Sequence, residues 1–128
     1  MVYLDSSVAL AHIGDEERAP PESLWGESLV SSRLLEYEIL ARLNAAGRGA
    51  SHGDVARELV RRVALLEMIE PVLGRAAQPF PVPVRTLDAL HLASMAFLRE
   101  QGVPVSLASY DRRLSAAAEA LGIGSYPL

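Results

Sequence analysis

Residues 1–13, Met1-Val-Tyr-Leu-Asp-Ser-Ser-Val-Ala-Leu-Ala-His-Ile13, predict a short strand that leads directly into a helix. Residues 2–4 form an apolar run suited to a strand, and Ser6 or Ser7 can cap a helix that follows it. Gly14 then ends that helix. A strand followed at once by a helix is the first half of a βα unit, which favours a parallel sheet.

The same alternation continues along the chain. Short strands are predicted at residues 29–31, 68–69, 105–108 and 123–126. Helices are predicted at residues 22–27, 33–46, 51–66, 71–77, 87–101 and 112–121, with caps at Ser31 or Ser32, Ser51 and Thr86 and with stops at Gly47 and Gly49. The expected fold is therefore α/β, with a short central parallel sheet and helices on both faces, which makes three layers.

Two proline-containing stretches connect these elements. Residues 15–21 are charged and predict an exposed connection, whereas Pro79, Pro81 and Pro83 predict a stiff one, because proline removes a backbone donor and restricts φ. Neither half of the chain could bury a core alone, and the sequence has no internal repeat. We therefore expect residues 1–128 to form a single domain.

Composition argues against several classes of protein. The 128 residues include no cysteine, which excludes disulfides and thiolate metal sites. No apolar run approaches the ~20 residues of a membrane helix, and the N-terminus lacks a basic region before an apolar stretch, so we expect a cytoplasmic protein with no membrane partner. All twelve basic residues are arginine, which argues against P-loop, Schiff-base and response-regulator receiver chemistry, because each normally uses a lysine.

Acidic residues follow two of the predicted strands. Asp5 comes directly after the first strand, and Asp111 follows the strand at residues 105–108. The carboxyl ends of parallel strands meet at one edge of a sheet, and Asp88 lies in the first turn of a helix, where the helix dipole favours a carboxylate at its end. Carboxylates gathered from distant segments repel one another, so a fold that collects them usually binds a hard cation such as Mg²⁺ or Mn²⁺. Such a site suggests phosphodiester chemistry.

A net charge of −4 is not typical of a protein that holds nucleic acid by bulk electrostatics. A nuclease is still compatible with it, because the acidic site adds to the negative total and a bound metal reverses the local sign of the charge.

Helical periodicity alone does not decide which glutamate is the fourth acid of the site. Glu36 and Glu38 face different ways on a helix, and the wheel places Glu36 on the apolar stripe while Arg42 is a possible ion-pair partner of Glu38.

Four segments carry these acids: Tyr3-Leu-Asp-Ser-Ser7, Ser32-Arg-Leu-Leu-Glu-Tyr-Glu38, Arg85-Thr-Leu-Asp-Ala-Leu-His-Leu-Ala93 and Ser109-Tyr-Asp-Arg-Arg113. In order and spacing they resemble the successive motifs of PIN-domain ribonucleases, and most of all those of VapC-type toxins of bacterial toxin–antitoxin pairs. The resemblance covers essentially the whole chain. In the second motif of that family the acid lies six residues after the serine, which implies Glu38 and leaves Glu36 as the rival.

The resemblance implies a metal-dependent endoribonuclease that cleaves RNA with a metal-activated water, leaving a 5′-phosphate and a 3′-hydroxyl. One or two Mg²⁺ or Mn²⁺ ions would be held by Asp5, Glu38, Asp88 and Asp111. Nearby candidates for orienting these ligands or for contacting RNA phosphates are Ser7, Ser109, Arg85, Arg112 and Arg113, although either serine could equally be an ordinary cap. His91 is expected to be a satisfied, partly buried structural residue, and Arg57, Arg61 and Arg62 a solvated helix face.

The resemblance also implies three partners: an RNA substrate, a cognate antitoxin and a second copy of the chain in a homodimer. A groove for the antitoxin is sought around the apolar residues Leu24, Trp25, Leu34, Leu35 and Ile39, which could equally be ordinary core. Two alternatives keep the fold but change the function, namely a PIN-fold nuclease of RNA maturation and a catalytically silent PIN binding module.

Overall fold

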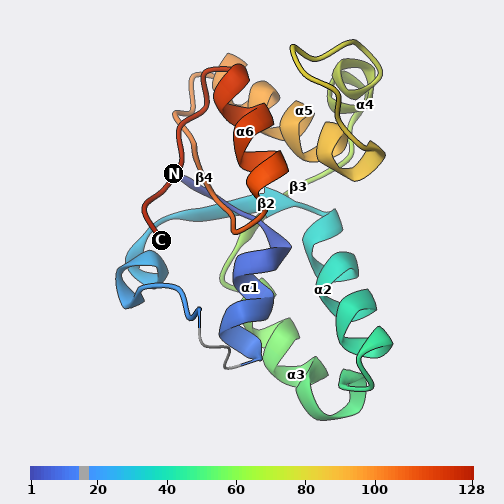
Figure 1. The fold of residues 1–128 in the computed structure, drawn as a ribbon, viewed down its shortest axis with the longest axis vertical. Coiled ribbons are helices and arrows are strands. Elements are labelled where there is room, and N and C mark those ends of the chain that lie inside the picture. Colours follow the sequence, from blue (N-terminus) through green and yellow to red (C-terminus); the bar gives the residue numbers. More distant parts are fainter. Residues whose placement is uncertain (15–17) are drawn as a thin grey trace.

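The computed structural model describes residues 1–14 and 18–128 and has a four-stranded parallel sheet at its centre (Figure 1). The strands are β1 (Val2–Leu4), β2 (Leu29–Ser32), β3 (Ala64–Leu66) and β4 (Ser106–Ala108), in the spatial order β3-β2-β1-β4. Tyr3 in β1 is in register with Val30 on one side and Leu107 on the other. The first strand of the chain is thus an inner strand of the sheet.

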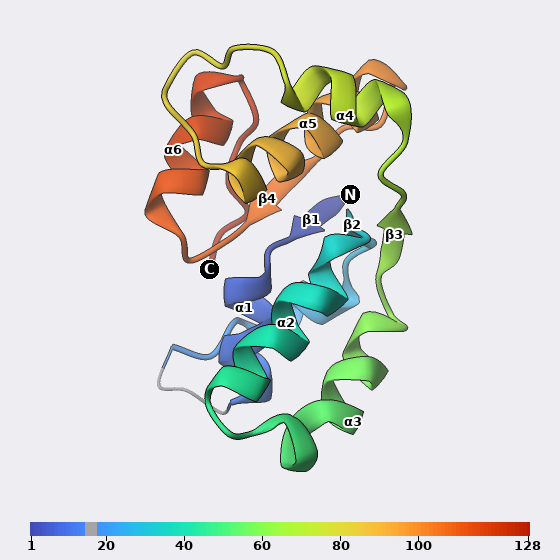
Figure 2. The same ribbon diagram turned by 90° about the vertical axis from the view of Figure 1, so that its right-hand side faces the viewer.

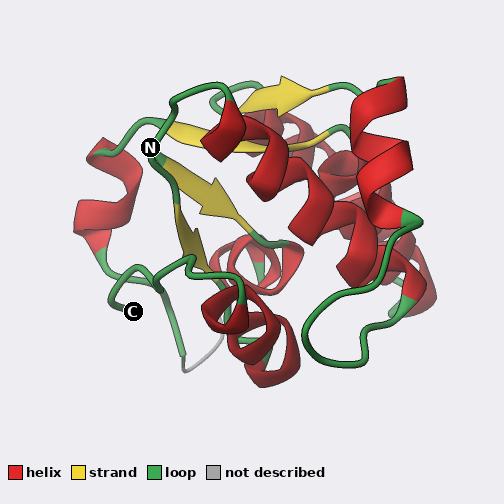
Figure 3. Cartoon of the chain, turned by 90° about the horizontal axis from the view of Figure 1, so that it is seen from above, coloured by secondary structure: helices red, strands yellow, loops and turns green. Residues whose placement is uncertain are grey.

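Helices cover both faces of this sheet, as expected (Figure 2). The helices α1 (Ser6–Ile13), α2 (Leu34–Ala45) and α3 (Gly49–Val60) pack together on one face. On the other face α5 (Thr86–Glu100) contacts both α4 (Glu70–Ala76) and α6 (Arg112–Ala120). A short 3₁₀ helix, η1 (Glu22–Gly26), precedes β2. The predicted three-layer α/β fold is therefore confirmed, and Figure 3 shows strands in yellow with red helices on either side of the sheet.

Alternate residues of β1, β2 and β4 enter two separate cores, because side chains along a strand point to opposite faces. One core, on the side of α1, α2 and α3, includes Val2, Leu4, Leu29, Leu35 and Ile39. The other core, on the side of α5 and α6, includes Tyr3, Val30, Leu92, Leu107 and Leu114. Burial on both faces explains why the strands are short apolar runs without a polar alternation.

Two of the predicted strands and both ends of one helix differ from the structure, and one strand was missed. The helix expected at residues 51–66 begins at Gly49 and ends at Val60, and β3 follows at Ala64–Leu66. Alanine and leucine favour helices locally, but pairing with the edge of β2 overrides that preference here. In the described chain, residues 68–69 form no strand, and the strand expected at 123–126 is reduced to one bridge between Ser125 and Leu107.

The caps also differ from the prediction. Asp5, rather than Ser6 or Ser7, is the N-cap of α1, and Arg85, rather than Thr86, precedes the first turn of α5. Gly47 follows α2 with a φ of 72°, which glycine adopts without strain, whereas Gly49 begins the next helix. Of the connection predicted at 15–21, residues 15–17 lie outside the described chain, and Pro20 is buried rather than exposed.

The order of the strands places a crevice beside β1. The chain leaves β1 through α1 and reaches β2 on one side, whereas β4 joins the other side of β1 after α5, from the opposite face. This is a switch point of a parallel sheet, where the loops after two neighbouring strands diverge and leave room for a ligand. Among the helices that the structure describes, none combines the length and apolarity needed to cross a bilayer.

Candidate active site

A cavity of about 370 Å³ lies at this switch point, and all four acids predicted from the sequence line it. Asp5 follows β1 and Asp111 lies beyond β4, while Glu38 comes from α2 and Asp88 from α5. The remaining lining residues are Ser6, Ser7, Arg42, Arg85, Thr86, Leu87, His91 and Arg113. The fold therefore brings together acids that are up to 106 positions apart in the sequence.

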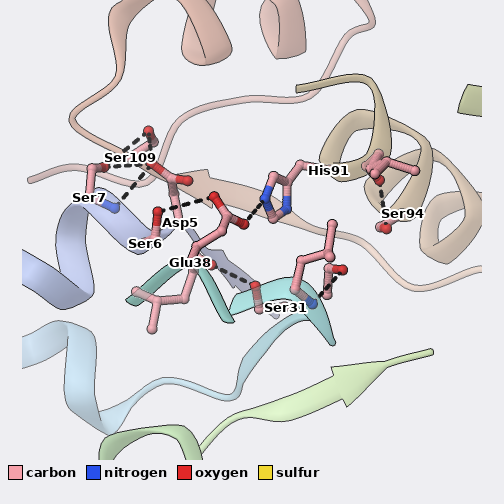
Figure 4. Close-up of polar contacts among 12 residues, drawn as sticks. Asp5, Ser6, Ser7, Ser31, Glu38, His91, Ser94 and Ser109 are labelled. Atoms are coloured by element: carbon pink, nitrogen blue, oxygen red, sulfur yellow. Dashed lines mark hydrogen bonds and ion pairs between the residues drawn. The ribbon is translucent and has the colours of Figure 1, made fainter. Parts of the chain in front are cut away.

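Asp5 is the most buried of the four acids, with 5% of its surface exposed. Its Oδ2 accepts hydrogen bonds from the hydroxyl of Ser7 at 2.6 Å and from the hydroxyl of Ser109 at 2.8 Å (Figure 4). Each hydroxyl oxygen in turn accepts a backbone N–H, from Tyr110 at 3.0 Å and from Asp111 at 2.9 Å respectively. The two serines predicted to orient a ligand thus both contact Asp5. Within the described chain, all the hydrogen bonds to this carboxylate go to Oδ2, so Oδ1 is available to a ligand.

Glu38 reaches the cavity from α2 and is held by a histidine. Its Oε1 lies 2.5 Å from Nε2 of His91, and the Ser6 hydroxyl donates to Oε2 at 3.4 Å. The other ring nitrogen of His91, Nδ1, lies 2.7 Å from the hydroxyl of Tyr3. His91 is satisfied and buried, as expected, but the sequence did not reveal its partner, and the ion pair expected between Glu38 and Arg42 is replaced by that with His91.

Glu36 points away from this cavity. It lines a different pocket beside α3, together with Arg33, Arg57 and Arg61. The buried residues of α2 are Leu35, Ile39 and Leu43, and the two glutamates lie on opposite edges of that stripe. The helical wheel, which favoured Glu36 as the buried acid, was therefore misleading, and the six-residue spacing from Ser32 identified the glutamate that lines the cavity.

Helix N-termini stabilise three of the carboxylates. Asp5 caps α1, and Asp111 caps α6 by accepting from the backbone N–H groups of Arg113 at 2.9 Å and Leu114 at 3.2 Å. Asp88, in the first turn of α5, accepts from the backbone N–H of Arg85 at 3.4 Å. The partial positive charge at each helix start offsets part of the repulsion among the acids.

Arginines supply the positive charge of the cavity. Arg113 lies 3.6 Å from Asp88 as an ion pair, and Arg42 and Arg85 also line the cavity. Of the three arginines expected near the acids, Arg85 and Arg113 line the cavity, whereas in the described chain Arg112 is exposed and lies outside the lining. The sequence did not single out Arg42 as a cavity residue, although its place one turn after Glu38 was a usable signal.

Burial and charge perturb the ionisation of two residues behind the cavity. Burial raises the pKa of the Tyr3 hydroxyl, which therefore stays protonated. Burial alone would lower the pKa of His91, but the hydrogen bond with Glu38 and the charges of Glu38, Asp5 and Asp88 outweigh it, so the pKa of His91 is raised above its ordinary value. The positive form of His91 is thus stabilised by the acids around it.

The donors of the cavity fit a hard divalent cation. They are carboxylate and hydroxyl oxygens, the ligands that Mg²⁺ and Mn²⁺ prefer. Within residues 1–14 and 18–128, no three acidic or histidine side chains are grouped closely enough to hold one ion together. Mg²⁺ commonly keeps several waters and uses only one or two carboxylates, so Asp5 with its available Oδ1 meets the minimum requirement.

Three of the five apolar residues considered for a partner groove lie in the core, whereas Leu34 and Trp25 are only partly buried. Leu24, Leu35 and Ile39 are fully buried members of the core on the α1–α3 side. Trp25 is partly buried against the same core, with its ring 4.4 Å from that of His12. These residues therefore pack the protein interior, which was the alternative that the sequence left open.

The fold and the cavity define an α/β protein with an acidic site at the switch point of a parallel sheet. A family model described as the PIN domain matches residues 2–120, and the chain belongs to this family. The PIN family and fold, expected from the four motifs, are thereby confirmed.

Relatives within the family include two ribonucleases of Mycobacterium tuberculosis. Ribonuclease VapC46 is 36% identical over 126 residues, with 95% of this chain and 93% of the relative covered. Ribonuclease VapC47 is 27% identical over 129 residues, with 95% of this chain and 93% of the relative covered. The crystal structure of M. tuberculosis VapC20, described as a toxin that cleaves the sarcin–ricin loop, matches with a TM-score of 0.67 at 19% identity, covering 91% of this chain and 95% of that chain.

Proposed function

We propose that this protein is an endoribonuclease, the toxin of a VapBC-type toxin–antitoxin pair. The observation that carries the proposal is the gathering of Asp5, Glu38, Asp88 and Asp111 around one cavity, in a chain 36% identical to Ribonuclease VapC46 along nearly all of its length. Carboxylates at the switch point of a parallel sheet suit metal-assisted hydrolysis of a phosphodiester bond.

The same four acids are the proposed ligands of one or two Mg²⁺ or Mn²⁺ ions. A bound ion would lower the pKa of a water molecule and offset the charge that develops on the scissile phosphate. Ser7 and Ser109 hold Asp5 through Oδ2 and leave Oδ1 to face a ligand. Asp111 is the most exposed of the four and caps α6, so its proposed contact with an ion runs through a water or a second ion.

The arginines are proposed to bind the RNA backbone on either side of the cleaved bond. Arg42, Arg85 and Arg113 line the cavity, and their guanidinium groups can pair with phosphate oxygens in a bidentate manner. Arg113 has a second role before RNA arrives, because its ion pair with Asp88 partly neutralises the cluster of acids. When RNA binds, Arg113 would therefore leave Asp88 and pair with a phosphate of the RNA.

An antitoxin and a homodimer complete the proposed assembly. The relatives carry the VapC name, and a cognate antitoxin that covers the acidic cavity would keep RNA out of it. The proposed site of action is the cytoplasm, where RNA is available. Light scattering of the purified protein, alone and with the product of a neighbouring small reading frame, would measure both the homodimer and the complex.

The experiment that tests the proposed function is cleavage of total cellular RNA by the purified protein, in Mg²⁺ or Mn²⁺ and in EDTA. Discrete fragments with 5′-phosphate ends should form only with the metal ion. Asp88→Asn should produce none, whereas Glu36→Gln, which changes an acid outside the cavity, should cleave like the wild type.

Cleavage retained in Asp88→Asn would contradict the proposed mechanism. If no metal supports cleavage and Mn²⁺ leaves the thermal midpoint unchanged, a catalytically silent PIN binding module becomes the better description. Fragments confined to one precursor RNA would instead favour a nuclease of RNA maturation.

A further inference from the structure

A chain of three polar groups, of which Tyr3 and His91 are buried and Glu38 is partly exposed, links the sheet to the acidic cavity. Tyr3, fully buried in β1, has its hydroxyl 2.7 Å from Nδ1 of His91, and Nε2 of His91 lies 2.5 Å from Oε1 of Glu38. The rings of Tyr3 and His91 meet edge to face, with centroids 5.8 Å apart and an interplanar angle of 79°. Figure 4 shows His91 pointing from α5 toward Glu38 on α2, so the chain crosses between helices on opposite faces of the sheet.

His91 lies in a largely apolar environment, so packing alone does not explain a polar residue there. Only 2% of its surface is exposed, and its neighbours on α5 include the fully buried Leu92 and Met95. A leucine there would fill the space without needing any hydrogen-bond partner. An imidazole needs partners for both nitrogens, because a buried polar group left unpaired costs stability. Both nitrogens have one, so each of the three groups depends on the other two.

The direction of the hydrogen bonds follows from the chemistry of the two ends. An ionised carboxylate only accepts, so Nε2 of His91 carries the proton that it donates to Glu38. In the neutral ring Nδ1 accepts from the Tyr3 hydroxyl, and in the protonated ring Nδ1 donates to the hydroxyl oxygen, so Tyr3 can pair with Nδ1 in either state. Tyr3 thereby fixes the ring orientation that presents the Nε2 donor to Glu38.

Glu38 makes two side-chain contacts within the described chain, and the shorter, with His91, is the one that restrains it. A glutamate has three side-chain torsions, and ordering such a side chain costs rotamer entropy. The other hydrogen bond of Glu38 within the described chain, from the Ser6 hydroxyl, is long at 3.4 Å. Without His91, the carboxylate would be free to leave the cavity or to be drawn to Arg42, which lies one turn further along α2 and also lines the cavity.

We propose that His91 is a positioning residue that holds Glu38 in place for a divalent ion, and that Tyr3 orients the ring of His91 from within the core. The inference rests on the proposed function, because it gives Glu38 a role toward the ion. A partner that orients a ligand typically changes metal affinity or activity by about tenfold to a hundredfold when it is removed.

Two substitutions that differ by one methylene group separate positioning from packing. His91→Gln places an amide donor near the position of Nε2, within reach of Glu38. His91→Asn keeps a polar atom near the position of Nδ1, beside Tyr3, but is too short to reach Glu38. Met95→Leu is the control, since Met95 is fully buried on α5 and the change conserves volume without removing any hydrogen bond.

The measurement is Mn²⁺ affinity by titration calorimetry without RNA, with thermal unfolding in EDTA and steady-state cleavage alongside. His91→Asn should bind Mn²⁺ about tenfold or more weakly and lose kcat, with the KM for RNA little changed, because the arginines that bind phosphate are intact. His91→Gln and Met95→Leu should stay within about threefold of the wild type in affinity. Tyr3→Phe should weaken Mn²⁺ binding in the same direction as His91→Asn, but by less.

Equal Mn²⁺ affinity in the wild type and His91→Asn, with wild-type cleavage intact, would overturn this inference and leave the proposed function standing. A wild type that neither binds Mn²⁺ nor cleaves RNA would overturn both. If His91→Asn does not fold, Tyr3→Phe and His91→Gln decide instead. Unchanged Mn²⁺ affinity in Tyr3→Phe would refute the proposed positioning. So would a loss of Mn²⁺ affinity in His91→Gln as large as the loss caused by Glu38→Gln.

Discussion

Replacing Asp111 with alanine should destabilise the protein by about 1 kcal/mol, whereas asparagine at the same position should leave the free energy of unfolding nearly unchanged. Asp111 is the N-cap of α6, and its Oδ1 accepts from the backbone N–H groups of Arg113 at 2.9 Å and Leu114 at 3.2 Å. Alanine leaves both groups without that acceptor. The loss of an N-cap side chain typically costs about 0.5–2 kcal/mol.

Asparagine keeps a side-chain oxygen with the same reach and ranks with aspartate as an N-cap. It removes a charge, and the attraction of that charge to the helix dipole is worth about 0.3–1 kcal/mol at low salt. The same change relieves repulsion from Asp5, Glu38 and Asp88 around the cavity, which acts in the opposite direction. The net effect of asparagine should therefore lie close to zero.

The assay is urea unfolding in EDTA at moderate salt. Because α6 contributes Leu114, Ala117 and Ala118 to the core, its N-cap should count in global unfolding rather than in local fraying. With an m-value of about 1–3 kcal/mol/M, a loss of 1 kcal/mol lowers the urea midpoint by roughly 0.3–1 M. Glu119→Ala, which removes one charge from the other end of α6, is the control and should stay within about 0.5 kcal/mol of the wild type.

The cleavage assay gives the second half of the prediction. Both Asp111 variants should lose RNA cleavage if the carboxylate serves the ion, although only the alanine variant loses stability. Equal stability of the alanine variant and the wild type would refute the capping argument. Equal destabilisation by alanine and asparagine would show instead that the charge, and not the oxygen, supports the start of α6.

Other predictions follow from the same geometry. Asp88→Asn should abolish cleavage while unfolding in EDTA at the same urea concentration as the wild type or slightly higher, because like-charge repulsion is relieved; marked destabilisation would contradict this. Glu38→Gln should lose cleavage and Glu36→Gln should keep it, as measured on one RNA substrate; the reverse result would reassign the ligand. The raised pKa of His91 implies that its pairing with Glu38 stabilises the fold fully below the unfolded pKa of about 6.5 and loses that contribution as the pH rises through the higher folded pKa. The difference in unfolding free energy between the wild type and His91→Gln, measured in EDTA from about pH 5.5 to 9, should therefore shrink as the pH rises; a constant difference would refute the shift. Mn²⁺ should raise the thermal midpoint of the wild type with increasing concentration, and a similar rise in Asp5→Asn would contradict the ligand role of Asp5.

Much of the fold was predictable because its signals are local. Each βα unit has an apolar run followed by a capped helix, and residues 2–4 and 106–108 form strands close to the predicted bounds. Strand direction then determines where Asp5 and Asp111 lie, since both follow the carboxyl ends of neighbouring parallel strands. The order of the four motifs added Glu38, which helical periodicity alone did not favour.

Tertiary structure decided what depends on partners distant in the sequence. Residues 64–66 have a helical preference, yet they form β3 because the edge of β2 offers unpaired backbone groups. The contact of His91 with Glu38 joins positions 53 apart, and its contact with Tyr3 joins positions 88 apart. The sequence by itself determined which side chains stand at strand ends and helix starts, because local propensities and capping set those positions. Only the packing of α5 and α2 about the sheet decided which of those side chains meet, because contact distances depend on how distant segments are placed in space.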